Sequence, residues 1–381
     1  MRVGIDGNLL CGQRTGMGTV TYNVLINYQP QKDIEITVYI PGKMDDGFYS
    51  KMKECGIKVV TYKKCNYILW EQIVLPRFLK EDKVDCVWFP YNTASLFSPC
   101  SSIVTIYDVI YMKESFLNPP TLYKKCGLLY RKLIVPFAAK KAKQIITSSK
   151  FAKDEIVSFF PKVNNKISIV YNGVDIINVK KAKELSLEND FYKFKVENNI
   201  GQDYILGFGS LEERKNSMRL IQGYEKLPIK IQKKYQLILF GFRGWQQSKE
   251  YAYLKLKHIQ NVKMLGYVSD TEKQLLYLNC KIFVFPSLAE GFGLPILEAF
   301  AASVPVITSN TTSLPEVAGE AAVFVNPEDV TDIASKIEML ISSCSLQQEL
   351  IEKGARQLEK FRWKNTSQSI FKIIKSIENH S

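Results

Sequence analysis

The sequence contains very little histidine, and this scarcity excludes several kinds of active site. Only His258 and His380 occur among 381 residues, and His380 is the penultimate one. A Ser-His-Asp or Cys-His hydrolase and a histidine-based zinc site are therefore nearly excluded. The eight cysteines include no Cys-x-x-Cys pair, so we expect free thiols in a reducing compartment.

Long apolar runs are also missing. No stretch reaches about 18 consecutive apolar residues, the length that a membrane-spanning helix needs. The N-terminus, MRVGIDGNLL, has one basic residue and too short an apolar run for a signal peptide. We therefore expect a protein that is made and kept in the cytosol.

Positive charge is present in excess, with a formal net charge of +13 at pH 7. This excess favours an anionic partner, such as a nucleotide, a nucleic acid or an acidic membrane surface. The lysines are dispersed and form no recognisable RNA-binding or DNA-binding module, which argues against nucleic acid. With 46% hydrophobic and 23% charged residues, the composition is that of an ordinary soluble globular protein.

Short β-rich runs alternate with helical segments along the chain, a pattern that builds parallel sheets. A polar stretch over residues 178–203 separates two such halves. We expect an α/β protein with two Rossmann-like domains, over about 1–175 and 176–360, and a C-terminal helical segment over 361–381. Predicted strands begin near residues 1, 35, 58, 84, 102, 144 and 167, and then near 204, 236, 262, 282, 304 and 321.

The most informative stretch is residues 281–310, which contain a strand, a loop, a helix from Pro295 and a second strand. Glycines in the loop would let the backbone approach a ligand, and the unpaired N–H groups at the helix start favour an anion such as a diphosphate. Glu290 and Glu298 would be repelled by phosphate, so they are better suited to accept hydrogen bonds from sugar or ribose hydroxyls. The alternative is an ordinary strand-helix-strand unit with packing glycines.

Two pairs of residues in the N-terminal half are candidate ligand contacts. Gly16 and Gly18 follow the first predicted strand and would allow close approach to a phosphate or sugar, although a plain connector is the alternative. A dinucleotide fingerprint would need a third glycine, so a nicotinamide-dependent oxidoreductase is the weaker reading. Tyr107 and Asp108 end a predicted strand that begins at Ser102, where ligands of open α/β sheets bind.

Basic residues mark two further places. Arg214 and Lys215 stand between a strand end and a helix, where cations can meet a phosphate, although such pairs often form only a solvated turn. Residues 121–143 combine lysines with aromatic and aliphatic residues, which suits either a membrane interface or a core helix with a solvated lysine face. We expect Pro136 to break this segment into two helices.

The run EGFGLPILE, from Glu290 to Glu298, resembles the E-x7-E signature of the retaining glycosyltransferases of family GT4, which have the GT-B fold. The resemblance covers nearly the whole chain, through TGMG at 15–18, RKN at 214–216 and LPEVAGEAAVFVNP at 314–327. It implies two Rossmann-like domains that face each other across a cleft, and a C-terminal helix that returns to the N-terminal domain.

The resemblance also implies a reaction, the transfer of a hexose from a nucleotide-diphosphate sugar to an acceptor hydroxyl with retention of configuration. Lys215, Arg214 and the Gly16 loop would stabilise the leaving diphosphate, Glu290 would bind sugar hydroxyls, and Glu298 would bind the ribose. Asp108 would orient the sugar or the acceptor. The other implied donor-site residues are Gly18, Gly291, Phe292, Gly293 and Leu294.

Three departures and absences qualify these roles. Tyr107 stands where many relatives have histidine, and Ser210 stands where many have arginine. The chain has no Asp-x-Asp, the pair with which many nucleotide-sugar enzymes hold a metal, so we expect neither a metal nor another cofactor. A glycoside hydrolase with Glu290 and Glu298 as acid and base is disfavoured, because these residues would lie beside a phosphate site.

The donor and acceptor are indicated only by the resemblance. GIDGNLL near the N-terminus and the RKN motif are similar to bacterial enzymes of O-antigen and capsule assembly, many of them mannosyltransferases. GDP-mannose is therefore the expected donor, with UDP-N-acetylglucosamine, UDP-glucose, dTDP-rhamnose and GDP-fucose left open. The basic segment over 121–143 would suit a lipid-linked glycan acceptor at the inner face of the cytoplasmic membrane.

Overall fold

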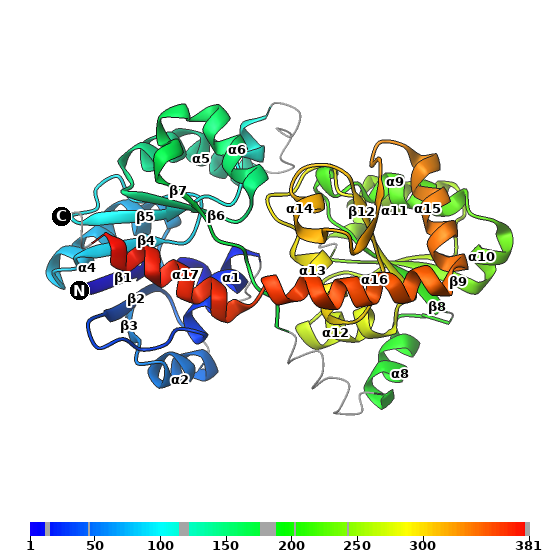
Figure 1. Ribbon diagram of the computed structural model, residues 1–381, viewed down its shortest axis with the longest axis horizontal. Helices are drawn as coiled ribbons and strands as arrows, with labels where there is room; N and C mark the ends of the chain where they lie inside the picture. The colour runs from blue at the N-terminus through cyan, green and yellow to red at the C-terminus, as the bar shows by residue number, and fades with distance from the viewer. Residues whose placement is uncertain are drawn as a thin grey trace. The chain divides into compact units, whose positions relative to one another are not determined.

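The computed structural model describes residues 1–11, 16–44, 46–113, 122–175, 188–201, 203–241 and 244–377, without the side chains of 122–124 and 188–190. The chain forms two compact units (Figure 1). Unit 1 contains Met1–Gly173 and Arg362–Ser381, and unit 2 contains Val174–Phe361. The sequence placed the corresponding boundaries after residues 175 and 360.

Unit 1 is built on a seven-stranded sheet in the order β3-β2-β1-β4-β5-β6-β7, in which all neighbouring strands are parallel. The strand order reverses between β1 and β4, so the carboxyl ends of these strands flank a crevice of the kind in which α/β proteins bind ligands. The strands are β1 (Arg2–Asp6), β2 (Glu35–Pro41), β3 (Lys58–Tyr62), β4 (Cys86–Phe89), β5 (Ser101–Thr105), β6 (Gln144–Thr147) and β7 (Ile167–Ile169).

Helices alternate with the strands of unit 1, as the sequence pattern predicts, except between β4 and β5, where residues 90–100 contain no helix. None of the helices that the structure describes in this chain is long and apolar enough to cross a membrane. The helices of unit 1 are η1 (Asn8–Leu10), α1 (Met17–Ile26), α2 (Asp46–Glu54), α3 (Tyr67–Leu69), the π-helix η2 (Trp70–Val74), α4 (Leu75–Glu81), η3 (Ile110–Met112), α5 (Leu122–Lys141), α6 (Lys150–Phe159), η5 (Pro161–Lys166) and α17 (Trp363–Ser376).

Helix α5 corrects one prediction. It is a single helix of 20 residues with Pro136 inside it, so the expected break into two helices is wrong. Proline removes one backbone hydrogen bond and strains the preceding turn, at a cost of about 3 kcal/mol. Val135, Ala138 and Ala139 are buried in the core of unit 1 on both sides of the proline. We infer that this packing keeps the helix continuous.

The C-terminal helix returns to the N-terminal unit, as predicted. Helix α17 belongs to unit 1 and lies beside α1 (Figure 1). The hydroxyl of Ser367 donates a hydrogen bond to the carbonyl of Val24, at 2.8 Å. Unit 1 is therefore completed by residues from both ends of the described chain.

Unit 2 repeats the architecture with a six-stranded parallel sheet in the order β10-β9-β8-β11-β12-β13. Phe283 and Phe285 of β11 pack in one hydrophobic cluster, while Ile282 and Val284 pack in another, so both faces of this strand are buried. The strands are β8 (Asp203–Phe208), β9 (Tyr235–Phe240), β10 (Val262–Met264), β11 (Ile282–Phe285), β12 (Val306–Ser309) and β13 (Ala322–Val325).

The predicted α/β class with two parallel sheets is confirmed by this second sheet.

In unit 2 the helices again alternate with the strands. They are α8 (Glu188–Glu197), η6 (Glu213–Lys215), α9 (Ser217–Glu225), α10 (Ile229–Lys234), η7 (Trp245–Gln247), α11 (Lys249–Leu256), α12 (Asp270–Asn279), α13 (Leu294–Ala301), α14 (Leu314–Ala318), α15 (Val330–Ser342), α16 (Cys344–Gln357) and η8 (Leu358–Lys360).

A buried carboxylate organises polar groups at the carboxyl edge of the unit 1 sheet. Glu71, on the π-helix η2, is fully buried. Its Oε1 accepts hydrogen bonds from the hydroxyls of Tyr67 and Thr93, each at 2.6 Å. Its Oε2 accepts one from Gln72 Nε2, at 2.8 Å, and one from the hydroxyl of Tyr130 on α5. Burial raises the pKa of Glu71, and these hydrogen bonds oppose the rise.

Asp6, the last residue of β1, is a second buried carboxyl group near this cluster. Its Oδ1 accepts a hydrogen bond from the indole of Trp70, at 2.8 Å. Its Oδ2 has no hydrogen-bond partner among the residues that the structure describes. Burial, the largest cause, and the nearby charge of Glu71 raise the pKa of Asp6 to about 7. Unit 1 therefore holds an acid whose protonation changes near neutral pH.

Replacing Asp6 by Asn should flatten the pH dependence of stability between about pH 4 and 7. The unfolded chain releases this proton near pH 3.8, whereas the folded protein keeps it up to about pH 7. The free energy of unfolding of the wild type therefore falls as the pH rises through this window, by roughly 4 kcal/mol from this one group. Urea denaturation at pH 4, 5, 6, 7 and 8 measures the slope.

Asp154→Asn, on the exposed face of α6, is the matched control and should keep the slope of the wild type. If Asp6→Asn shows the same slope as Asp154→Asn, Asp6 does not carry a raised pKa in the folded protein.

Candidate functional site

The loop between β11 and α13 is held in one conformation by its own backbone contacts. Gly293 precedes α13 with φ 117°, and a Cβ at this position would lie 2.8 Å from Leu314 Cδ2, so glycine is required for both reasons. The hydroxyl of Ser313 lies 2.8 Å from the carbonyl oxygens of both Glu290 and Phe292. The residue type at position 293 and the Ser313 contact thus fix where the Glu290 backbone lies.

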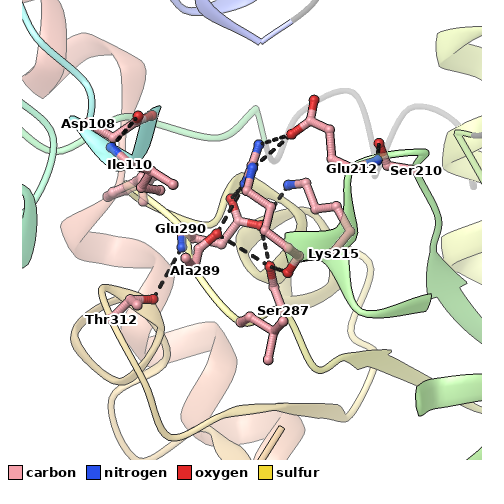
Figure 2. A network of polar contacts seen from close by, with 12 residues as sticks. Asp108, Ile110, Ser210, Glu212, Lys215, Ser287, Ala289, Glu290 and Thr312 are labelled. Atoms are coloured by element: carbon pink, nitrogen blue, oxygen red, sulfur yellow. Dashed lines mark hydrogen bonds and ion pairs between the residues drawn. The ribbon is translucent and has the colours of Figure 1, made fainter. Parts of the chain in front are cut away.

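Glu290 is the centre of a buried polar cluster at the end of β11. Its Oε1 lies 2.6 Å from Lys215 Nζ and 2.7 Å from Ser287 Oγ, and the three side chains point toward one another (Figure 2). Glu290 is 7% exposed and Lys215 9% exposed. The ammonium group of Lys215 also lies 5.1 Å from the centre of the Phe208 ring and 5.2 Å from that of Phe285. Aromatic faces favour a cation at these distances.

The neighbouring cations keep the Glu290 carboxyl group charged. Burial by itself would raise the pKa of Glu290, but the charges of Lys215 and Arg214 outweigh burial and lower the pKa to about 2. Burial lowers the pKa of Lys215, and the charge of Glu290 opposes that shift. Glu290 is therefore a carboxylate at neutral pH, able to accept hydrogen bonds but carrying no proton to donate.

Arg214 connects the cluster to a second carboxylate. Its NH1 donates to Glu290 Oε2, at 2.8 Å, and to the carbonyl of Ala289, at 3.1 Å. Its Nε and NH2 each lie 2.7 Å from Glu212 Oε2 (Figure 2). The structure thus brings the predicted residues Arg214, Lys215 and Glu290 together, with two partners, Glu212 and Ser287, that the sequence did not single out.

Asn216 explains why the turn after β8 reaches this cluster. It has a left-handed backbone conformation, with φ 59°, which asparagine tolerates better than most residues. Its side-chain amide donates to the carbonyl of Pro286, at 2.9 Å, and to that of Pro327, at 2.7 Å. The third residue of the RKN motif is therefore structural, since it ties the turn with the two cations to the end of β11.

Glu298 has different partners from Glu290. It lies on α13, and its Oε1 is 2.8 Å from Lys273 Nζ while its Oε2 accepts from the hydroxyl of Tyr277, at 3.2 Å. The charge of Glu298 raises the pKa of Lys273. Both partners lie four residues apart on α12, whose N-cap is Ser269 in a capping box with Glu272. The four-residue spacing was the one sequence signal for this pair.

Two other predicted donor-site residues have side chains in or against the hydrophobic core. Phe292 is 6% exposed, and its ring centre lies 5.8 Å from that of Phe361. Leu294 is partly buried against the same core. Any donor contact from these positions, and from Gly291 beside them, would come from the backbone.

The predicted residues of unit 1 lie at the carboxyl edge of its sheet. Gly16 precedes α1 with φ 46°, and a Cβ on Gly18 would lie 2.5 Å from the carbonyl oxygen of Leu9. Residues 12–15 of this loop, with Thr15 of the TGMG motif, lie outside the described residues, as do the side chains of Tyr123 and Lys124 in the basic segment. Unit 1 therefore requires glycine at position 18 for packing, whatever the loop binds.

Tyr107 and Asp108 follow β5 in a loop, because the strand ends at Thr105 rather than at Asp108. The backbone N–H of Tyr107 donates to Asn92 Oδ1, at 2.8 Å, and Asp108 Oδ1 accepts from the backbone N–H of Ile110, at 3.2 Å. Burial raises the pKa of Tyr107, so its hydroxyl is neutral at physiological pH.

Among the residues that the structure describes, no three His, Cys, Asp or Glu side chains gather in a way that could hold a metal ion. The candidate site of unit 2 contains three cations, Arg214, Lys215 and Lys273, which pair with three carboxylates, Glu212, Glu290 and Glu298.

Comparison with known proteins identifies the family. Residues 14–177 match the sequence model described as "Glycosyltransferase Family 4", and residues 188–357 match that described as "Glycosyl transferases group 1". The chain is 33% identical over 273 residues to O-antigen chain mannosyltransferase B of Escherichia coli. This match covers 71% of this chain and 69% of that protein. The chain is 28% identical over 278 residues to the longer serotype-specific mannosyltransferase WbdA of Escherichia coli, of which it covers 32%.

Among solved structures, that of Anabaena Alr3699/HepE in complex with UDP-glucose has the same fold. Its TM-score is 0.72 at 17% identity, over 99% of this chain and 100% of that one. The two family matches, the Escherichia coli relative and this fold agree with the EGFGLPILE and RKN motifs and with the two parallel sheets. This chain belongs to the family 4 glycosyltransferases with the GT-B fold.

Proposed function

We propose that this protein transfers mannose from GDP-mannose, with retention of configuration, to a lipid-linked glycan in the synthesis of a cell-surface polysaccharide. The observation that carries the proposal is the buried cluster of Lys215, Arg214 and Glu290 at the end of β11. The names of the Escherichia coli relatives, both mannosyltransferases, support the choice of mannose. The family assignment replaces the oxidoreductase and nucleic-acid alternatives.

The two cations suit the departure of a diphosphate. In the reaction, the bond between the sugar C1 and the diphosphate oxygen breaks, and a bond between C1 and the acceptor oxygen forms. Negative charge grows on the diphosphate, and Lys215 would stabilise it strongly because its ammonium group is buried, where charges interact over a low dielectric. The acceptor proton passes to the leaving phosphate oxygen in this proposal. These cations would also do the work of a metal, so we propose that transfer needs none.

The charge state of Glu290 supports a binding role. A carboxylate with a pKa of about 2 accepts hydrogen bonds, which suits the hydroxyls of a donor sugar. The same value excludes Glu290 as the proton donor of a glycoside hydrolase, because that carboxyl group must keep its proton near neutral pH. Glu298, whose side chain is 27% exposed, would accept hydrogen bonds from the ribose. The roles of Asp108 and Gly16, in unit 1, rest on the family resemblance.

Helix α5 supports the proposed acceptor at a membrane surface. Leu129, Leu133 and Phe137 are spaced by four residues along one side of the helix, and they are 59%, 57% and 60% exposed. Lys140 and Lys141 are exposed at the end of the same helix. An apolar stripe with nearby lysines is suited to the interface of an anionic bilayer. We propose that this stripe holds the protein on the inner face of the cytoplasmic membrane.

The donor is tested by measuring transfer and binding with GDP-mannose, UDP-N-acetylglucosamine, UDP-glucose, dTDP-rhamnose and GDP-fucose, each in EDTA. We expect GDP-mannose to bind selectively and EDTA to change nothing. Lys215→Ala should reduce turnover by about a hundredfold or more, because it removes a charge that acts on the transition state. Glu298→Ala should weaken donor binding, and the anomeric configuration of the product, read by NMR, reports retention.

Lys233→Ala, an exposed lysine at the end of α10, is the control for charge and should behave as the wild type. Because Lys215→Ala removes one of the two cations paired with the buried Glu290, thermal unfolding of Lys215→Ala/Glu290→Gln separates loss of the fold from loss of the site. Normal binding and turnover in Lys215→Ala and Glu298→Ala would overturn the proposal.

Membrane binding is tested with the triple variant Leu129→Ser, Leu133→Ser and Phe137→Ser. Each buried apolar side chain contributes roughly 1.5 to 3 kcal/mol, so partial insertion of three predicts at least a tenfold loss of binding. Flotation with vesicles that contain phosphatidylglycerol measures it. The control Ile229→Ser/Leu256→Ser removes apolar residues of unit 2 that are 64% and 78% exposed, and it should float as the wild type does. Equal loss in both would mean that α5 is not the anchor.

A further inference from the structure

The cluster around Arg214 is formally neutral, although the proposed function needs it to hold an anion. Arg214 and Lys215 contribute two positive charges, and Glu212 and Glu290 contribute two negative charges. A nucleoside diphosphate would bring further negative charge to this cluster. A diphosphate that binds the Nε and NH2 groups of Arg214 would therefore meet the Glu212 carboxylate, which holds both groups.

The two carboxylates that hold Arg214 differ in how easily they can move. The Glu290 side chain is 9% exposed and has two further partners, Lys215 and Ser287. The Glu212 side chain is 54% exposed. An exposed ion pair contributes only about 0 to 1 kcal/mol, whereas breaking a buried one costs several times more. The pair between Arg214 and Glu212 is the one that can open.

The backbone around Glu212 stays in place when its side chain swings away. Its N–H donates to the hydroxyl of Ser210, at 3.1 Å, and its carbonyl accepts from the N–H of Lys215, at 2.9 Å. Opening the pair thus requires rotation of one exposed side chain. It leaves Arg214 attached to Glu290 through NH1, with Nε and NH2 turned toward the space that the Glu212 carboxylate occupied.

We propose that Glu212 is an internal competitor of the diphosphate for Arg214. The Glu212 carboxylate lies on the Nε and NH2 side of the guanidinium group, one of the sides through which arginine can bind a phosphate with two hydrogen bonds. Donor binding displaces this carboxylate, and its return helps to expel the nucleoside diphosphate after transfer. Glu212 thereby sets the affinity for donor and product. This inference rests on the proposed function.

Glu213 offers a matched control at the next position. Its Oε1 pairs with Lys249 Nζ, at 2.7 Å, and its side chain is 72% exposed. Glu213→Gln and Glu212→Gln change the net charge by the same amount, at neighbouring exposed sites. Only the second removes a partner of Arg214.

The experiment measures the dissociation constants of GDP and UDP, and the KM and kcat for the donor, in the full-length wild type, Glu212→Gln and Glu213→Gln. We expect Glu212→Gln to tighten nucleoside diphosphate binding and to lower the KM by roughly threefold to tenfold, without raising kcat. Glu213→Gln should change both by less than about twofold. In an Arg214→Ala background, Glu212→Gln should bring no gain, because the competed group is gone.

Three results would overturn the inference: equal effects of the two glutamine variants, weaker binding in Glu212→Gln, or a gain that persists without Arg214. If the wild type binds no nucleoside diphosphate at all, the proposed function fails and this inference falls with it. If the wild type binds one and Glu212→Gln binds it equally, the proposed function stands and only the role of Glu212 is wrong.

Discussion

The ion pair between Lys215 and Glu290 is the interaction on which the candidate site depends. Removing an ammonium and a carboxylate from water costs several kcal/mol per ion, and their attraction offsets this only when geometry and hydrogen bonds are good. Here the distance is 2.6 Å, Ser287 supplies a hydrogen bond, and two aromatic rings face the ammonium group. Gly293 and Asn216 hold the two backbone segments that present the pair. A substitution of Gly293 or Asn216 would therefore disturb the site by moving Lys215 and Glu290 relative to each other.

The two units place carboxyl groups at the carboxyl edges of similar sheets but give them opposite electrostatics. In unit 2 the neighbours of Glu290 are cations, which lower its pKa to about 2 in spite of burial. In unit 1 the neighbour of Asp6 is another carboxyl group, Glu71, and the pKa of Asp6 rises to about 7. Burial is the largest cause for both residues. The charges of Lys215 and Arg214 outweigh it at Glu290, whereas the hydrogen bond from Trp70 does not outweigh it at Asp6. A shared architecture thus gives one edge a permanent anion and the other a titrating acid.

Helix α5 shows the same dependence of a local feature on its surroundings. One side of the helix is buried in unit 1, and the stripe of Leu129, Leu133 and Phe137 lies exposed. Tyr130 reaches from this helix to Glu71, so the polar cluster at the sheet edge also fixes how the helix sits on unit 1. The orientation of the exposed stripe therefore follows from the packing of the opposite face of the helix and from the Tyr130 contact.

The sequence by itself determined the order of strands and helices, the two parallel sheets and the family motifs, because hydrophobic runs and glycines act over a few neighbouring positions. It also predicted Lys215, Arg214 and Glu290 as donor-site residues, and the structure places these three side chains in one cluster. Only the tertiary structure decided which charges meet, since Lys215 and Glu290 are 75 positions apart, and it alone revealed Glu212, Lys273 and Glu71 as partners. Packing likewise overrode the local effect of Pro136, because burial of its neighbours outweighs one lost hydrogen bond.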